Sequence, residues 1–438
     1  MALLKTLPEH IPLSQGVDLL FLPEPRLKRA LLQVDFDLPL DGDCAARTLL
    51  AQVLEQGSAA HPSRMYLAQR QEQLFGATVS FGGFRAAEKH RMRLQLGWVG
   101  ERFLPNGETL AVNVLGLGRE LLEEPRRGEG DAPFDAAVLE RERAQLARHI
   151  RGFVDDRAGY AQQRFYEAMC AGEPFAQAPW GTVGEVEGLH GQELEAARLA
   201  VLKQGRVLIL AVGPIERDPL VDALRAWLGE AGTWGEPRAE LPEAVSREPG
   251  ELREVREELP VDQARFHLGF RIARPASSEE MEPMLLANAV LGGGIQGRLF
   301  RIVREERSLA YGISSEVLTG KGMLTVGAGI DASKAEEVRD EVLRQVADLA
   351  ENGPTEEEVA MCKASFFNGL QSLADSAGSL ARFYAREFQF RLHRSPAERA
   401  AVLESLGAQD VQRAAQTWMA DTSFLMAAPE ASLADSVG

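Results

Sequence analysis

The sequence predicts an α+β protein made of two similar halves. Three observations lead to this fold class: a motif that recurs half a chain away, apolar alternation typical of strands in both halves, and helices with clear start signals. The motif begins at Asp156 and ends at Phe165-Tyr166, and it recurs from Asp375 to Phe383-Tyr384. The two starts lie 375 minus 156, or 219, residues apart in a chain of 438 residues, which indicates an internal duplication.

Strands are predicted where apolar and polar residues alternate. In the first half this pattern covers residues 32–38 and 91–98, and in the second half it covers 266–270. Residues 311–331 read as a hairpin that turns near Gly320 to Gly322. Because only one face of each strand is apolar, we expect half-buried antiparallel strands.

Helices are predicted from their capping residues and apolar spacing. Ser333 with Glu336 and Thr355 with Glu358 fit capping boxes. Between these two start signals, Val338, Val342, Val346 and Leu349 form one apolar stripe at helical spacing. Each half is therefore expected to combine strands with helices that back the sheet.

The predicted domain boundaries follow from this repeat. Residues 1–229 form the first domain and residues 261–438 the second. Residues 230–260 are rich in Glu, Pro and Gly and show no apolar period after Trp234, so they are expected to form an extended, solvated linker.

Composition excludes several classes of function. The chain has 48 Lys and Arg against 65 Asp and Glu, a net charge of −17, which disfavours nucleic acid as a partner. No apolar run approaches the length of a membrane span, and no secretory signal is recognised, so a cytoplasmic location without membrane association is expected. Cys44, Cys170 and Cys362 are too few and too far apart for a disulfide framework or a thiolate zinc site, and core positions are expected for them.

The common nucleotide-binding and metal-binding motifs provide little evidence for a site in this sequence. Gly292, Gly294 and Gly297 satisfy the G-x-G-x-x-G pattern of dinucleotide-binding turns. That turn follows a strand, whereas Met284 to Leu291 reads as the end of a helix, so a glycine-rich turn between two helices is expected. The seven histidines never recur at a spacing of three or four residues, so no pair is placed to hold a metal on one helix face.

One stretch resembles a known family. Residues 291–311 read LGGGIQGRLFRIVREERSLAY, and this run is similar to the C-terminal-domain motif of the pitrilysin/insulinase (inverzincin) metallopeptidases, with Gln296-Gly297 in place of the usual small residue and serine. Phe75-Gly76-Ala77 and the segment beginning Glu140-Arg141 also fall in the order of that family. The resemblance implies two α+β domains, each an antiparallel or mixed sheet backed by helices, that face each other as a clamshell.

The resemblance also implies that the zinc site is lost. Active members carry H-x-x-E-H on a helix, and the matching His, Glu and His positions hold Thr48, Ala51 and Gln52. The position of the third ligand, a glutamate in the family, matches His149, while Glu142 on the same predicted helix is retained. We therefore expect no catalytic residue, no metal and no cofactor on this chain, and no peptide hydrolysis by the chain alone.

Two substrate-binding residues of the family match Arg304 and Tyr311, which keep the family's spacing of seven residues. In active relatives this pair holds the substrate backbone from the C-terminal domain. A guanidinium and a phenol can both donate hydrogen bonds to a developing oxyanion. Ordinary surface or half-buried positions are the alternative explanation for both side chains.

The leading hypothesis is a non-catalytic, substrate-binding subunit of a heterodimeric zinc peptidase. Its partner would be a homologous zinc-bearing subunit, or a second copy of the chain, and its substrate a peptide; zinc is expected only on the partner. The alternative is an inactive peptide-binding or assembly scaffold within a larger complex. A third hypothesis, an unusual metal site at Glu142 and His149, lacks an evident third ligand.

Overall fold

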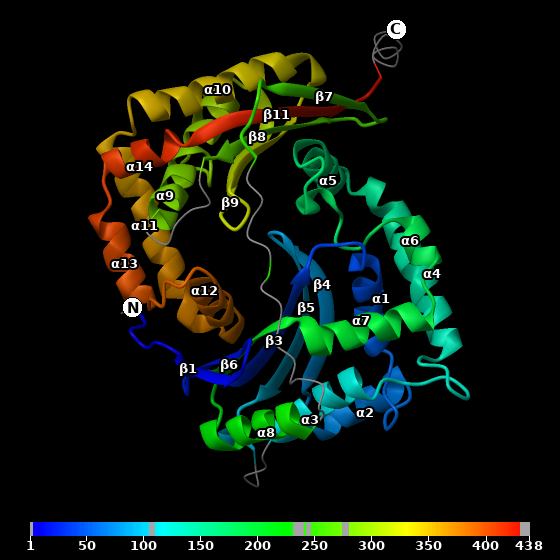
Figure 1. Ribbon diagram of the computed structural model, residues 1–438. Coiled ribbons are helices and arrows are strands. Elements are labelled where there is room, and N and C mark those ends of the chain that lie inside the picture. The colour runs from blue at the N-terminus through cyan, green and yellow to red at the C-terminus, as the bar shows by residue number, and fades with distance from the viewer. Residues whose placement is uncertain (1–2, 105–109, 231–240, 242–246, 274–279, 430–438) are drawn as a thin grey trace.

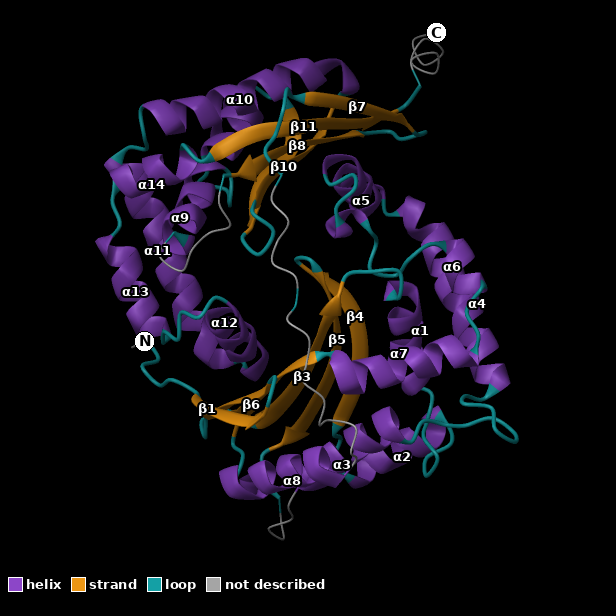
Figure 2. Ribbon diagram, in the orientation of Figure 1, coloured by secondary structure: helices purple, strands orange, loops and turns teal. Residues whose placement is uncertain are grey.

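The computed structural model describes residues 3–104, 110–230, 241, 247–273 and 280–429. Within these residues the chain forms two sheets, each backed by helices, and the two sheets lie in opposite halves of the molecule (Figures 1 and 2). The predicted α+β clamshell fold is confirmed. None of the helices in the described ranges combines the length and the apolar character that crossing a membrane requires.

The first sheet has six strands in the order β1-β2-β6-β3-β5-β4. Only the pair β2–β6 is parallel. The strands span β1 Glu9–Ser14, β2 Val17–Pro23, β3 Arg29–Pro39, β4 Thr78–Ala86, β5 Lys89–Val99 and β6 Arg206–Gly213. The helices of this half are α1 Cys44–Leu54, α2 Arg64–Gln73, α3 Leu110–Glu123, α4 Ala136–Gly152, α5 Arg157–Met169, α6 Val183–Glu187, α7 Gly191–Gln204 and α8 Arg217–Glu230.

The second sheet repeats this topology with five strands in the order β7-β11-β8-β10-β9. Its only parallel pair, β7–β11, corresponds to β2–β6, and both sheets end on the outer strand of a hairpin, β4 or β9. The strands span β7 Arg253–Glu258, β8 Ala264–Ile272, β9 Ala310–Leu318, β10 Met323–Ile330 and β11 Trp418–Ala427. The helices are α9 Met281–Leu291, the π-helix η4 Leu299–Glu306, α10 Ala335–Glu351, α11 Glu356–Ser372, α12 Ala377–Gln389, α13 Pro396–Ser405 and α14 Ala408–Ala415.

The two copies of the repeated motif form helices α5 and α12, and each packs on the sheet of the other half. Helix α5 contacts β8 and β11, and α12 contacts β6 and β3 (Figure 1). Gly269 of β8 makes the first of these contacts possible, because a Cβ atom there would lie 2.3 Å from the sulfur of Met169. The halves are therefore interlocked through two apolar clusters, one around each exchanged helix.

Most predicted elements are confirmed, with three corrections. The strands at 32–38, 91–98 and 266–270 lie in β3, β5 and β8, and the hairpin at 311–331 is β9–β10. However, β3 is buried on both faces, because α12 covers its polar face and Asp35 is paired there with Arg93 at 2.6 Å. The half-buried prediction for this strand is wrong.

The second correction concerns the start of α10. The capping box at Thr355 and Glu358 is present. The one expected at Ser333 and Glu336 is not, because Asp331 accepts the hydrogen bonds of the Ser333 amide and hydroxyl and begins a short 3₁₀ turn instead. Helix α10 then starts at Ala335 without a side-chain cap.

The third correction concerns the linker predicted at 230–260. Its last part forms β7, which pairs in parallel with β11 and takes the place that β2 has in the first half. Residues 231–240 and 242–246 of the predicted linker lie outside the described residues. The division into domains at 229 and 261 stays a prediction.

Candidate functional site

The positions that match the zinc-binding helix lie on α1 and are used for packing. The Thr48 hydroxyl donates a hydrogen bond to the carbonyl of Pro179 at 2.7 Å. Ala51 is buried, and the side-chain oxygen of Gln52 is buried without a hydrogen-bond partner among the described residues. A hydroxyl already bound to the backbone, a methyl group and an amide do not provide the imidazole and carboxylate ligands that zinc requires.

The fourth position, His149, lies on α4 together with Glu142. Glu142 is buried and accepts a hydrogen bond from Arg141 at 2.9 Å. His149 is exposed and packs edge-on against Trp180, with ring centroids 6.3 Å apart. Across the described ranges, no group of three or more His, Cys, Asp and Glu side chains is arranged to hold a metal ion. The alternative metal site at Glu142 and His149 gains no support.

A histidine that no sequence pattern indicated lies beside Thr48. His90 of β5 is buried, and its Nε2 lies 3.1 Å from the same Pro179 carbonyl and 3.3 Å from the Thr48 hydroxyl. Burial, followed by the nearby charge of Arg47, lowers the pKa of His90 to about 4. His90 is therefore neutral near pH 7 and stabilises the packing between α1, β5 and the loop at Pro179. His90 could be recognised only from its contact with Pro179, which lies 89 residues away in the sequence, and no local residue pattern predicts such a contact.

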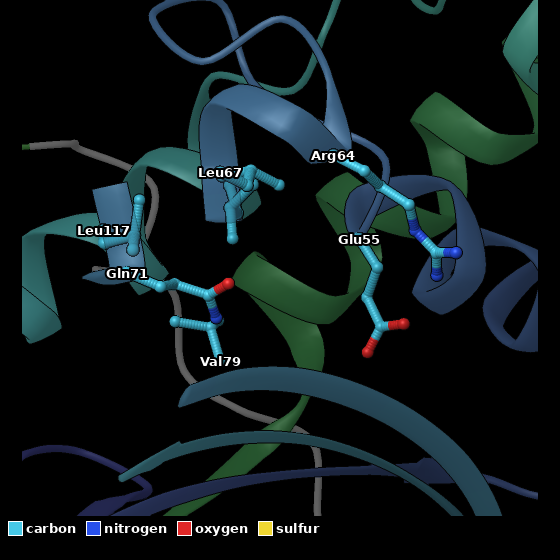
Figure 3. A pocket seen from close by; sticks show the side chains of 7 residues that line it. Glu55, Arg64, Leu67, Gln71, Val79 and Leu117 are labelled. Carbon is cyan, nitrogen blue, oxygen red and sulfur yellow. The ribbon is translucent and has the colours of Figure 1, made fainter. Parts of the chain in front are cut away.

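A cavity of about 280 Å³ adjoins the end of α1 (Figure 3). Leu67 and Gln71 of α2, Val79 of β4 and Leu117 of α3 form part of its lining, and Glu55 and Arg64 lie at one end. Glu55 accepts a hydrogen bond from the backbone of β4, and burial raises the pKa of its carboxyl. A single carboxylate that is already hydrogen-bonded to a backbone amide does not make a metal or catalytic site, so we assign this cavity no function.

The glycine-rich turn joins α9 to η4, as the sequence predicted. Gly292 needs its missing side chain, since a Cβ atom would lie 2.8 Å from Leu299 and 3.0 Å from the hydroxyl of Ser315. Its carbonyl accepts a hydrogen bond from the Ser315 amide of β9 at 2.9 Å. The turn is thereby fixed to β9 and sets the position of η4.

Arg304 lies on η4, a π-helix of eight residues. Such helices are rare and often occur at functional sites. The guanidinium of Arg304 lies 4.5 Å from the ring centroid of Phe300, one turn earlier, and 3.4 Å from Glu305. Its side chain is 40% exposed, so the donor groups remain accessible to a ligand.

Tyr311 occupies a bulge in the edge strand β9. Ala310 is paired with Ile330 and Gly312 with Gly329, so Tyr311 has no partner in this register. A bulge of this kind redirects a side chain. In regular alternation Tyr311 would share the buried face of Ile313, but it is 68% exposed.

Glycines form the surface beside Tyr311. Gly312, Gly327 and Gly329 lie on the inner face of the second sheet and line a cavity of about 410 Å³ that α5 closes on one side. His267 also lines it, and burial, followed by the nearby charge of Arg265, lowers the pKa of His267 to about 4. Side chains of Gln263 and Arg265 lie over Gly329, whereas the space at Gly312 is open, so an extended backbone can approach the sheet there, next to the exposed phenol.

The two predicted substrate-binding residues thus lie on elements that pack against each other, η4 and β9. Tyr311 is exposed and the side chain of Arg304 is 40% exposed, and each residue occupies a local irregularity of the backbone. Their role in holding a substrate stays a prediction. The sequence could locate them only through the resemblance, because neither the π-helix nor the bulge has a distinctive residue pattern.

Comparisons with known proteins agree with the fold and with the family resemblance. The family model "Peptidase M16 inactive domain" matches residues 189–366. The chain is 24% identical over 385 residues to "Probable inactive metalloprotease YmfF" of Bacillus subtilis, covering 88% of this chain and 89% of that protein. It is 25% identical over 282 residues to "Uncharacterized zinc protease Mb2805c" of Mycobacterium bovis, covering 64% of each chain.

The fold also matches solved structures. A conserved protein from Enterococcus faecalis V583 superposes with a TM-score of 0.86 at 21% identity, covering 97% of this chain and 99% of that one. The fold is a clamshell like that of M16 peptidases, and the positions expected to match the zinc ligands hold Thr48, Ala51, Gln52 and His149. By these comparisons the chain is similar to members of the M16 (pitrilysin/insulinase) metallopeptidase family, including a relative named as a probable inactive metalloprotease.

Proposed function

We propose that this chain is a non-catalytic, substrate-binding subunit of a two-chain zinc peptidase. Arg304 and Tyr311 would donate hydrogen bonds to a peptide carbonyl in a site whose zinc is on a homologous partner. One observation supports this most: Thr48, Ala51 and Gln52 have become packing residues, whereas both donors stay exposed on irregular backbone.

The chemistry of the pair suits this role. A guanidinium keeps its positive charge at all physiological pH values, and a phenol can donate a single directed hydrogen bond. Two donors aimed at one carbonyl stabilise the negative charge that develops on its oxygen. Gly312 leaves room for the peptide backbone beside Tyr311, because a Cβ atom there would meet nothing within 4 Å.

The direct experiment mixes this chain with a zinc-bearing M16 homologue from the same organism and an unstructured fluorogenic peptide. We expect cleavage that neither chain supports alone. Arg304→Ala should remove most of the gain, because one donor to the developing charge is lost. Arg301→Ala is the matched control: Arg301 lies on the same helix, is 56% exposed and is paired with Glu358. Equal cleavage by the partner with and without this chain would exclude the proposal.

A second copy of this chain is the other candidate partner. If the chain paired only with itself, sedimentation of an equimolar mixture would show homodimers and no mixed species. Because no metal ligands are gathered among the described residues, a homodimer is not expected to cleave peptides. A cytoplasmic location, expected from the sequence, also stays a prediction, and fractionation of the source cells tests it.

An assembly or peptide-binding scaffold is the second candidate function. The interlocked helices α5 and α12 and a buried ion cluster between the halves favour it, since they suit a rigid body. This function predicts that Arg304→Ala and Tyr311→Phe leave the biological activity unchanged. The reconstituted cleavage assay therefore separates the two candidates.

A further inference from the structure

A second cavity, of about 670 Å³, lies behind the glycine-rich turn. Its walls come from that turn, the end of α9 and the helices α11, α12 and α13. Cys362, Phe366, Leu370 and Phe383 give it an apolar floor. Its volume falls in the range of ordinary small-ligand sites.

Three arginines also line this cavity: Arg382, Arg386 and Arg399. None of the described residues that line it is Asp or Glu. Arg399 is paired at 2.8 Å with Glu282, which does not line the cavity. The excess positive charge therefore comes from Arg382 and Arg386, in a chain whose net charge is −17. A cavity with cations on an apolar floor selects for a ligand that has both an anionic and an apolar part.

Arg386 has no carboxylate hydrogen-bonded to it within the described residues. Its only hydrogen bond within the described ranges runs from Nη2 to the sulfur of Met281 at 3.0 Å, and its Nε has no partner there. Glu282 and Glu387 are close, and each accepts a hydrogen bond from Arg394, at 3.0 and 3.1 Å. The other oxygen of each carboxylate has no partner among the described residues, and neither carboxylate is hydrogen-bonded to Arg386. Burial lowers the pKa of Arg386 to about 10, although these two carboxylates act against the shift. A partly buried guanidinium with a thioether as its acceptor is poorly stabilised without an anion.

We propose that this cavity binds the carboxylate end of an apolar chain, with Arg386 and Arg382 on the carboxylate and the apolar part on the floor of the cavity. Arginine binds carboxylates through paired hydrogen bonds, which gives both strength and direction. Two sources share this chemistry: a free fatty acid, and the C-terminal carboxylate of a peptide with apolar last residues. The site is separate from Arg304 and Tyr311, so its test does not depend on peptide cleavage.

Calorimetry on the purified full chain tests the proposal with two pairs of probes. Dodecanoate is compared with dodecanol, and the free acid of N-acetyl-Leu-Leu-Phe is compared with its C-terminal amide. We expect at least one acid to bind ten-fold or more tightly than its neutral counterpart, and the acid that binds identifies the source. Equal binding within both pairs, or no binding of either acid, would overturn the proposal.

Variants then locate the site. Arg386→Met should weaken binding of the acid at least ten-fold, and Arg382→Met tests the rim without disturbing the buried arginines. Gly369→Phe should fill the cavity, because Gly369 of α11 lines it, a Cβ atom there would meet no atom within 4 Å, and replacing a helical glycine favours the helix. If Gly369→Phe binds the acid as the unchanged protein does, the assigned location is wrong.

Two matched controls complete the design. Arg148→Met removes an exposed arginine from α4 in the other half. Gly116→Phe adds the same side chain to an exposed helical glycine with open space around it on α3. Both should leave binding unchanged, and circular dichroism confirms that each variant is folded. A loss of binding in either control as large as in its test variant would also count against the proposal.

Discussion

Lys321 joins the two halves in a buried ion cluster. It lies in the turn between β9 and β10, and its side chain is fully buried. Its ammonium group binds Glu88 in the turn between β4 and β5 and Glu173 at 2.5 Å. The neighbouring Gly320 lies against Ala87, since a Cβ atom there would be 3.1 Å away. The hairpin tips of the two sheets therefore meet, and the cluster holds the closed arrangement.

Replacing Lys321 with methionine should destabilise the protein strongly. Glu173 would keep its hydrogen bond to Arg271 at 2.6 Å, but the buried Glu88 would lose its cation. Removing one partner from a buried ion pair costs about 3–5 kcal/mol, because the remaining charge is left without compensation. Glu88→Gln should cost less, about 1–3 kcal/mol, since Lys321 keeps Glu173.

Urea unfolding followed by circular dichroism measures these changes, with Lys203→Met as the control at an exposed position of α7. The double variant Lys321→Met/Glu88→Gln should lose less stability than the sum of the single losses, because both changes remove the same contact. A loss below about 1 kcal/mol for Lys321→Met, or strictly additive losses, would refute the reasoning.

Three further predictions concern local contacts. The folded-state pKa of His90 is about 4, below its ordinary value of 6.5. The contribution of neutral His90 to the free energy of unfolding is therefore complete above pH 6.5 and is lost as the pH falls toward 4. Urea unfolding at pH 7 and at pH 4 should show that His90 accounts for about 3 kcal/mol of the lost stability, and His90→Gln should remove this part of the pH dependence. Thr48→Val should cost about 1 kcal/mol in thermal unfolding, because the hydrogen bond to Pro179 is lost, and an unchanged melting temperature would contradict this. Gly292→Ala should cost about 1–3 kcal/mol by the same assay, since the added methyl group overlaps Leu299, whereas an exposed glycine such as Gly116 should tolerate alanine.

Much of the fold could be predicted because its strongest signals are local. Apolar alternation located β3, β5 and β8, and the repeated motif, which forms α5 and α12, indicated the duplication but not that these segments are helices. Strand β7 was missed because Arg253–Glu258 contains one apolar residue among charged ones, and its pairing with β11 joins segments far apart in the chain. The exchange of α5 and α12 between the halves was missed for the same reason, since periodicity shows which face of a helix is buried but not against which sheet.

For the candidate site, too, the sequence predicted some features and not others. Arg304 and Tyr311 were located by resemblance, but the geometry that exposes them was not. Residues 299–306 have apolar spacing that fits an ordinary α-helix, and the bulge at Tyr311 depends on the register with β10. The arginine-lined cavity could not be found from the sequence at all, because helices α11, α12 and α13 and the glycine-rich turn meet only in the folded chain.

The most direct test of the account is the turnover rate of the reconstituted two-chain peptidase with Tyr311→Phe. The substitution removes only a hydroxyl group from a side chain that is 68% exposed, so folding and pairing should not change. We predict that kcat falls roughly 100-fold, as for the loss of one donor to the developing oxyanion, while the zinc content of the partner stays constant. An unchanged kcat in a mixture whose cleavage depends on this chain would contradict the central claim.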